Sequence, residues 1–241
     1  MAKFRTIFER SEQKYLISDA QYAALMEKIS DHLREDEYGK STVCNLYFDT
    51  PSQRVIHRSM EKPLYKEKLR LRCYGVPNNE SNAFVELKKK FKGVVYKRRI
   101  CLPYEEAYAW LCQDGTPPER ADLRQIVGEI EWFRKMYSPL GPAFLIACER
   151  RALFDKENPD LRITFDENIR FRTFDLDLRN GVGGTPILPK DQRLMEIKAA
   201  GALPRWLIEA LNGNKIYPTS FSKYARSFNQ YLVEGERTYV G

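Results

Sequence analysis

Residues 66–74 read Lys-Glu-Lys-Leu-Arg-Leu-Arg-Cys-Tyr, and this stretch gives the clearest indication of the fold. Side chains alternate between the two faces of a β-strand, so residues two apart share a face. One face of this strand is therefore apolar and carries Leu69, Leu71 and Cys73. The opposite face carries a row of cations: Lys66, Lys68, Arg70 and Arg72.

The same alternation recurs in four other segments of the chain. Segments 84–90 and 94–102 are expected to pair as a hairpin through Phe91-Lys-Gly93. Segments 161–165 and 195–199 are two more short strands with one apolar and one charged face. The pattern therefore predicts at least five strands that are amphipathic in the same way.

We interpret the charged faces as converging on a shared interior, while helices cover the apolar faces from outside. The predicted fold is α+β, a closed antiparallel eight-stranded β-barrel that forms a tunnel with a basic interior. The proposed inner faces carry thirteen cations: Arg10, Lys14, Lys66, Lys68, Arg70, Arg72, Lys88, Lys90, Lys97, Arg99, Arg150, Arg162 and Lys198. They carry four carboxylates: Glu12, Glu86, Asp166 and Glu196.

The alternative interpretation turns these charged faces outward into solvent. A solvated sheet face usually mixes the two signs more evenly, because like charges directly opposite each other are destabilising. An interior lined by cations is unfavourable without a ligand, because like charges in a confined space repel one another and lower the pKa of each lysine. It becomes tolerable when water fills the interior and an anion neutralises the charge. The excess of cations therefore favours a site for a polyanion.

The composition agrees with an anionic partner. Forty Lys and Arg against 33 Asp and Glu give a net charge of +7, which suits nucleic acid, phosphorylated metabolites or acidic membrane surfaces. The five cysteines include no CxxC pair and are expected to be reduced thiols of an intracellular protein. No signal peptide or membrane span is recognisable, so we expect a cytoplasmic chain.

The order of elements predicts one domain over residues 1–241, with a helical insert around residues 103–142. A capping box at Ser18-Asp-Ala-Gln21 is expected to open a helix that runs to about Leu33. The acidic residues 34–39 are expected to form a loop. A terminal helix is expected at 221–232, with Ser222 as its N-cap.

The charged residues are suited to phosphate chemistry. Arginine grips phosphate oxygens in a bidentate manner and lysine provides a point contact. Glu196, with Glu12 or Glu86, is a candidate to hold a divalent cation through hard oxygen ligands. The alternative for each carboxylate is a salt bridge to a neighbouring cation. No P-loop or GxSxG motif is present, which argues against a P-loop NTPase or a serine hydrolase.

Nine segments together resemble the VTC-type polyphosphate polymerase domain, a branch of the triphosphate tunnel metalloenzymes. The resemblance covers nearly the whole chain. The segments, in order, are Arg10-Ser-Glu-Gln-Lys-Tyr15, Tyr47-Phe-Asp-Thr50, Lys68-Leu-Arg-Leu-Arg72, Val85-Glu-Leu-Lys88, Lys97-Arg-Arg99, Glu149-Arg150, Arg162-Ile-Thr-Phe-Asp166, Leu194-Met-Glu-Ile-Lys198 and Ser220-Phe-Ser-Lys-Tyr224.

This resemblance implies a tunnel that binds ATP and a divalent metal, Mn²⁺ or Mg²⁺, and extends inorganic polyphosphate. The residues implied to act in catalysis are Arg70, Arg72, Lys88, Lys97, Arg150, Arg162 and Lys223. Further phosphate contacts are implied for Lys14, Arg10, Lys68, Arg99, Lys198 and Ser222. The metal is expected on Glu196, with Glu12 and Glu86 as further candidates.

Three positions depart from the family pattern. The wider superfamily begins with a Glu-x-Glu-x-Lys strand, and Arg10 replaces the first Glu, which disfavours a hydrolase with two acid-bound metals. Ser220 stands where the VTC branch often has Lys, and Cys148 where it often has Tyr. Any coupling to membrane transport is expected to need a partner chain.

Four functions follow from these observations. The first is an ATP-dependent polyphosphate polymerase, and the second is a tunnel-type triphosphatase. The third is a non-catalytic module that binds polyphosphate or nucleotides. A single-stranded RNA binder is the weakest, because few of the charged faces carry the interleaved aromatics that stack bases, and we expect no nucleic-acid partner.

Overall fold

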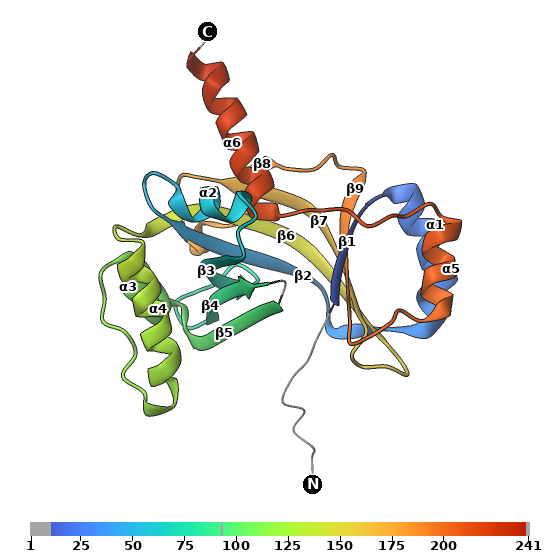
Figure 1. Ribbon diagram of the computed structural model, residues 1–241, viewed down its shortest axis with the longest axis horizontal. Helices are drawn as coiled ribbons and strands as arrows, with labels where there is room; N and C mark the ends of the chain where they lie inside the picture. Colours follow the sequence, from blue (N-terminus) through green and yellow to red (C-terminus); the bar gives the residue numbers. More distant parts are fainter. Residues whose placement is uncertain (1–10, 93, 240–241) are drawn as a thin grey trace. The chain divides into compact units, whose positions relative to one another are not determined.

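The computed structural model describes residues 11–92 and 94–239, with side chains described to residue 233 (Figure 1). The chain divides into two compact units. Unit 1 comprises Met1–Ser41, Glu149–Asn168 and Leu188–Phe221. Unit 2 comprises Thr42–Cys148, Ile169–Ile187 and Ser222–Gly241. The prediction of a single domain stays a prediction.

Unit 1 contains strands β1 and β9 and helices α1 and α5, together with a part of each of β2, β6 and β7. The bounds of its elements are β1 Ser11–Ser18, α1 Asp19–Ile29, η1 Ser30–His32, β2 Leu33–Asp49, β6 Gly141–Asp155, β7 Arg162–Arg172, β9 Gln192–Ala199 and α5 Arg205–Gly213. The predicted capping box is confirmed, because the Gln21 N–H donates to Ser18 Oγ and the Ser18 N–H donates to Gln21 Oε1.

Unit 2 contains the remaining parts of β2, β6 and β7 and the other elements of the chain. Their bounds are α2 Arg54–Met60, β3 Tyr65–Tyr74, β4 Asn82–Phe91, β5 Val94–Pro103, α3 Tyr104–Cys112, η2 Ala121–Leu123, α4 Arg124–Met136, η3 Leu178–Asn180, β8 Thr185–Pro186 and α6 Lys223–Tyr239. The hairpin β4–β5 is therefore confirmed, and α3 and α4 lie within residues 103–142, where the helical insert is predicted. Gly93 of the predicted turn lies outside the described residues.

The strands pair in the order β1-β9-β7-β6-β2-β3-β4-β5, and β8 pairs with β7. The predicted α+β fold with an antiparallel sheet is confirmed by the registers of β1–β9, β7–β9, β2–β3, β3–β4 and β4–β5. Closure into a barrel is not confirmed. Within residues 11–92 and 94–239, β1 and β5 end the strand order and do not pair with each other.

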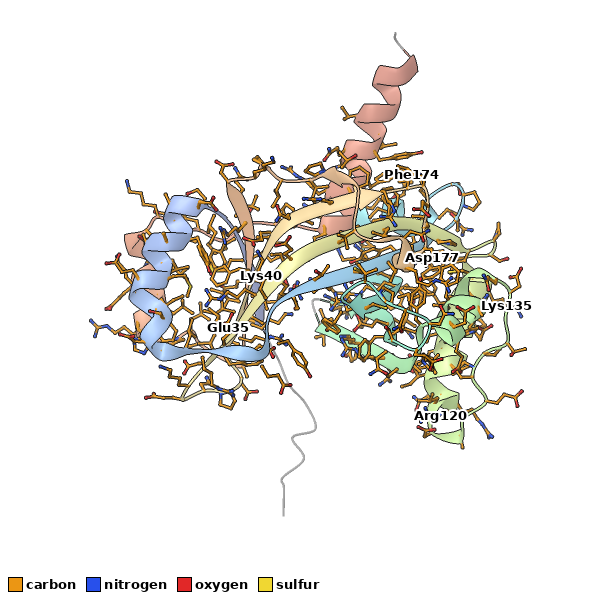
Figure 2. All side chains as sticks on the ribbon, turned by 180° about the vertical axis from the view of Figure 1, so that it is seen from behind. Glu35, Lys40, Arg120, Lys135, Phe174 and Asp177 are labelled. Atoms are coloured by element: carbon orange, nitrogen blue, oxygen red, sulfur yellow. The ribbon has the colours of Figure 1, made fainter. Side chains whose placement is uncertain are left out.

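The prediction of a loop at residues 34–39 was wrong, because these residues belong to the long strand β2. Two of their acidic side chains contact arginines of β6 and β7. Glu35 Oε1 accepts a hydrogen bond from Arg151 Nε at 2.7 Å, and Asp36 Oδ2 accepts one from Arg162 at 3.3 Å. Figure 2 labels Glu35 on this strand. The high charge of residues 34–39 therefore does not indicate a solvated turn.

Helices cover the apolar face of the strands in each unit, as the sequence predicts. In unit 2, Leu69, Leu87 and Ile100 of β3, β4 and β5 pack in one core with Trp110 of α3 and Phe133 of α4. Figure 1 shows α3 and α4 beside these three strands.

In unit 1, Ile17, Phe165 and Ile197 of β1, β7 and β9 pack with Leu25 of α1 and Leu207 of α5. The charged side chains of both sets of strands are therefore on the faces that these helices leave uncovered. Within the described part of the chain, none of the helices is both long and apolar enough to cross a membrane.

Candidate functional site: a cationic sheet face

Eight cations share one face of β3, β4 and β5 in unit 2, and we call this set the cationic face. It consists of Lys66, Lys68, Arg70, Arg72, Lys88, Lys90, Lys97 and Arg99. The strand register places lysines directly opposite one another. Lys66 is the partner of Lys90, and Lys88 is the partner of both Lys68 and Lys97. Such like-charge pairs are destabilising in a sheet unless an anion is bound between them.

Glu86 lies at the centre of this face and is 1% exposed. Arg70 donates to Glu86 Oε2 through Nε at 2.7 Å, and Arg99 donates to Oε1 through Nε at 2.6 Å. Lys97 Nζ lies 2.5 Å from Oε1. Both oxygens therefore contact cations, which is the salt-bridge alternative to the metal ligation considered for this residue.

Glu86 remains ionised in spite of its burial. Burial alone would raise its pKa, but the charges of Arg70, Arg72 and Lys97 hold the pKa well below its usual range. The carboxylate thus fixes the directions of two guanidinium groups. It also leaves a large surplus of positive charge on the same face.

Arg70 and Arg72 are also oriented by polar residues of β2. Arg70 Nη1 donates to Tyr47 Oη at 3.1 Å, and Arg72 Nε donates to Asn45 Oδ1 at 2.8 Å. Asn45 Nδ2 in turn donates to the Ile146 carbonyl at 3.2 Å. The sequence pattern alone assigns no role to Asn45 or Tyr47. The available signal was their alternation with the buried Cys44 and Leu46, which places both polar residues on the face of Arg70.

The surplus charge changes the titration of its neighbours. Burial would raise the pKa of Tyr47, but Arg70, Arg72 and Lys68 outweigh burial and lower the pKa to about 8. Burial, together with the charges of Arg99 and Arg70, lowers the pKa of Lys97 to about 8 although Glu86 opposes the shift. Both groups therefore report a strongly positive potential, which an anion would relieve.

Three lysines of the cationic face have no carboxylate within ion-pair distance in the described part of the chain. They are Lys66, Lys88 and Lys90. Burial lowers the pKa of Lys66, and the charges of Lys90, Lys62 and Lys88 lower it further. Lys66 and Lys88 are half-buried and Lys90 is exposed. A phosphate group would supply the negative charge that these three lysines lack.

The start of α6 is attached to the same face. Ser222 is the N-cap, because its Oγ accepts a hydrogen bond from the Ala225 N–H at 3.4 Å, and Lys223 is the first helical residue. Tyr224 stacks on Tyr47 with ring centroids 4.7 Å apart, and Lys68 Nζ lies 5.5 Å from the Tyr224 ring centroid.

Asp49 connects this helix start to α2. Its Oδ2 accepts a hydrogen bond from Tyr224 Oη at 2.7 Å and another from the Ile56 N–H at 3.0 Å. Its Oδ1 accepts from the Val55 N–H at 2.8 Å. Asp49 is 2% exposed, so a buried carboxylate joins the two helices to the strand that carries Tyr47.

A second charged group lies in unit 1 on β1, β7 and β9. Lys14 Nζ lies 3.4 Å from Glu12 Oε1 and 3.8 Å from Glu196 Oε1. Lys198 Nζ lies 4.0 Å from Glu12 Oε2 and 4.0 Å from Glu196 Oε2. Lys14 also donates to the Phe221 carbonyl at 2.9 Å. Two lysines and two carboxylates of the predicted site are therefore brought together.

The two predicted arginines of unit 1 each contact a carboxylate. Arg150 binds the fully buried Asp166 through Nε at 2.5 Å and Nη2 at 2.6 Å. Arg162 Nη2 donates to Asp36 at 3.3 Å, while its Nε is buried without a hydrogen-bond partner in the described residues. Lys40, labelled in Figure 2, contacts Glu149 and Glu167 in this unit. Arg10 lies outside the described residues.

Glu12 and Glu196 form the donor set that fits a divalent cation. Mg²⁺ is commonly held by one or two carboxylates and takes its other ligands from phosphates and water. Thr164 is the strand partner of Glu196 and is 2% exposed, and its hydroxyl has no hydrogen-bond partner among the described residues. A ligand oxygen or a water would satisfy that hydroxyl. Residues 11–92 and 94–239 contain no group of three or more His, Cys, Asp or Glu that could hold a metal alone.

Comparisons with known proteins agree with this fold. The model of the VTC domain family matches residues 9–232, whereas no curated protein matches the chain. The fold is similar to that of a candidate adenylate cyclase from Bacillus halodurans, with a TM-score of 0.54, 15% identity, and coverage of 88% of this chain and 92% of that chain. It is also similar to a candidate adenylyl cyclase from Hippeastrum described as having a dominant triphosphatase activity, with a TM-score of 0.50, 15% identity, and coverage of 91% and 95%. At these identities the likeness concerns the fold alone.

Replacing Glu86 with Gln tests whether this carboxylate is the ionic centre of the face. We expect the free energy of unfolding to fall by about 3–5 kcal/mol, because the substitution leaves buried cations without their counter-charge. Glu129→Gln is the matched control, since Glu129 pairs with Lys89 and Arg98 at the surface, and it should cost at most about 1 kcal/mol. Urea denaturation measures both. Equal effects of the two substitutions would contradict the assignment.

The pH dependence of triphosphate binding tests the potential at Tyr47 and Lys97. Bound triphosphate favours the neutral phenol and the charged lysine, so the complex holds protons that the free protein loses as pH rises through about 8. Affinity should therefore fall above that pH, by about tenfold per group between pH 7 and 9.

Tyr47→Phe removes one of the two titrating groups. Calorimetry should show that its affinity for tripolyphosphate still decreases over the same pH range. The factor of this decrease should be about tenfold smaller than for the unsubstituted protein. Because both proteins are titrated with the same ligand, the effect of ligand ionisation is the same in both pH profiles and cancels in their comparison. Identical pH profiles for the two proteins would show that Tyr47 does not titrate in this range.

Proposed function

The chain belongs to the VTC domain family, and on that premise we propose that it is an ATP-dependent polyphosphate polymerase. The proposed reaction transfers the terminal phosphoryl group of ATP to the end of a polyphosphate chain and releases ADP. The observation that carries the proposal is the cationic face, in which lysines oppose lysines around one buried carboxylate.

The length of the cationic face suits a polymer. Lys66 and Arg72 stand at the two ends of the cation row on β3 and are six positions apart along the strand. At about 3.3 Å per residue the row spans roughly 20 Å. A row of this length offers contacts to successive phosphates of an extended chain as well as to a triphosphate.

The proposed roles follow from the electrostatics of phosphoryl transfer. In this step the bond from the γ-phosphorus to the oxygen that bridges it to the β-phosphate breaks, and a bond to the terminal oxygen of the chain forms. Catalysis of such a step depends mainly on positioning and charge stabilisation. Arg70 and Arg99, held in place by Glu86, would position phosphate oxygens, while Lys88 and Lys97 would neutralise the charge that moves to ADP.

The charged group of unit 1 would contribute in the same chemical sense. Lys14, Arg150, Arg162 and Lys198 are proposed phosphate contacts, and Glu196 with Glu12 would hold Mn²⁺ or Mg²⁺. Such an ion neutralises phosphate oxygens and orients them. Ser222 and Lys223 are proposed to contact phosphate at the start of α6, because the dipole of a helix favours an anion at its N-terminus.

Product analysis tests the reaction. Purified protein incubated with ATP and Mn²⁺ should yield ADP and a long anionic polymer, resolved by gel electrophoresis and ³¹P NMR. Formation of ADP and inorganic phosphate without polymer would contradict the polymerase proposal and indicate a triphosphatase. Tight binding of polyphosphate without ADP formation would leave a binding module.

Neighbouring lysines of β4 provide a matched pair of variants for the same assay. Lys88→Met should lower the rate of ADP formation by about 10- to 100-fold, because one charged contact to phosphate is worth about 1.5–3 kcal/mol. The substitution breaks no ion pair within the described residues, so the fold should persist. Lys89 points to the opposite face and pairs with Glu129, so Lys89→Met should keep its rate within about twofold. Equal loss in both variants would contradict the role of the cationic face.

A further inference from the structure

A cavity with two arginines in its lining lies on α2 in unit 2, and none of its lining residues belongs to the cationic face. Its volume is about 400 Å³, which is within the range of pockets for small ligands. We call it the α2 pocket. Its lining residues are Ser52, Arg54, His57, Arg58, Glu61 and Tyr137.

Two arginines in the α2 pocket are held by one buried tyrosine. Arg54 and Arg58 are four residues apart on α2, so they share a side of the helix. The Arg54 guanidinium lies 5.8 Å from the centroid of the Tyr137 ring, and Arg58 Nη1 lies 3.5 Å from Tyr137 Oη. Tyr137 is 3% exposed, so its position is fixed by packing. Both arginines are exposed to solvent, and both guanidinium groups lie beside the same tyrosine.

These two arginines lack the counter-charges that several other surface arginines have. Arg98, Arg151 and Arg179 each contact a carboxylate at 3.1 Å or less. Within the described part of the chain, neither Arg54 nor Arg58 has a carboxylate within ion-pair distance. Two convergent and uncompensated guanidinium groups match the oxygens of a phosphate in a bidentate manner.

The rest of the α2 pocket narrows the class of ligand. The first N–H groups of α2 already donate to Thr50 and Asp49, so an anion there would depend on side chains. Ser52 and His57 add hydrogen-bonding groups, whereas Glu61 adds one negative charge. A carboxylate beside the arginines repels a long polyanion and accepts hydrogen bonds from hydroxyl groups. The pocket therefore fits a small ligand with one phosphate group and hydroxyls.

We propose that the α2 pocket binds the phosphate group of a small phosphate monoester, gripped by Arg54 and Arg58 against Tyr137. This site is additional to the cationic face and does not depend on the polymerase proposal. Inorganic phosphate presents the same chemistry without the hydroxyls. Glycerol 3-phosphate and inorganic phosphate are therefore the two probes that distinguish an ester from free phosphate.

The test is calorimetric titration of both probes in a Lys88→Met background, where binding to the cationic face is weakened. Adding Arg54→Met and Arg58→Met together should weaken binding of the remaining phosphate at least tenfold. Adding Arg124→Met is the matched control and should change it less than twofold, because Arg124 also has no carboxylate contact in the described residues and lies outside the pocket. Tighter binding of glycerol 3-phosphate than of phosphate identifies an ester site, and equal binding identifies a site for free phosphate.

Three outcomes would overturn the inference. The first is loss of all phosphate binding in Lys88→Met itself, which would assign the phosphate to the cationic face. The second is unchanged binding after both arginine substitutions. The third concerns Glu61→Gln, which breaks no side-chain contact in the described residues and should tighten phosphate binding at least twofold even if the double variant fails to fold. No tightening there would contradict a phosphate beside Glu61.

Discussion

The ion pairs of Glu86 are the interaction on which the candidate site depends. One buried carboxylate fixes Arg70 and Arg99, while Lys66, Lys88 and Lys90 on the same sheet face have no carboxylate within reach among the described residues. Repulsion among so many like charges on one sheet face lowers the free energy of unfolding. The surplus is understandable when a polyanion completes the charge balance during function. The same surplus of positive charge lowers the pKa of the neighbouring Tyr47.

The alternation of strand side chains explains how the fold accommodates this charge. Each charged strand face is backed by an apolar face, which packs against α3 and α4 in unit 2 and against α1 and α5 in unit 1. The hydrophobic core is therefore built on one side of the strands, and the cations need no burial within it. Asp49 adds a second constraint, because its hydrogen bonds to α2 and to Tyr224 fix two helices beside the cationic face and the α2 pocket.

Much of this arrangement is predictable from sequence, because a period of two residues determines which side chains share a face. The faces of β3, β4 and β5 follow from that rule, whereas the hairpin follows from a turn signal and the helices after β5 from a change to the helical period. The roles of Asn45 and Tyr47 do not, since they depend on the register that places Tyr47 opposite Arg70. The sequence also does not decide whether Glu86 binds a metal or forms ion pairs, because this depends on the cations that the neighbouring strands place beside it. The strand at residues 34–39 was missed because arginines distant in sequence neutralise its carboxylates.

A crystal structure of the protein with bound tripolyphosphate would show whether the cationic face is a phosphate site. We expect phosphate oxygens within hydrogen-bond distance of Lys88, Lys97 and Arg70, with Glu86 still paired to its arginines. Tripolyphosphate bound elsewhere, with those three side chains directed into bulk solvent, would contradict this expectation.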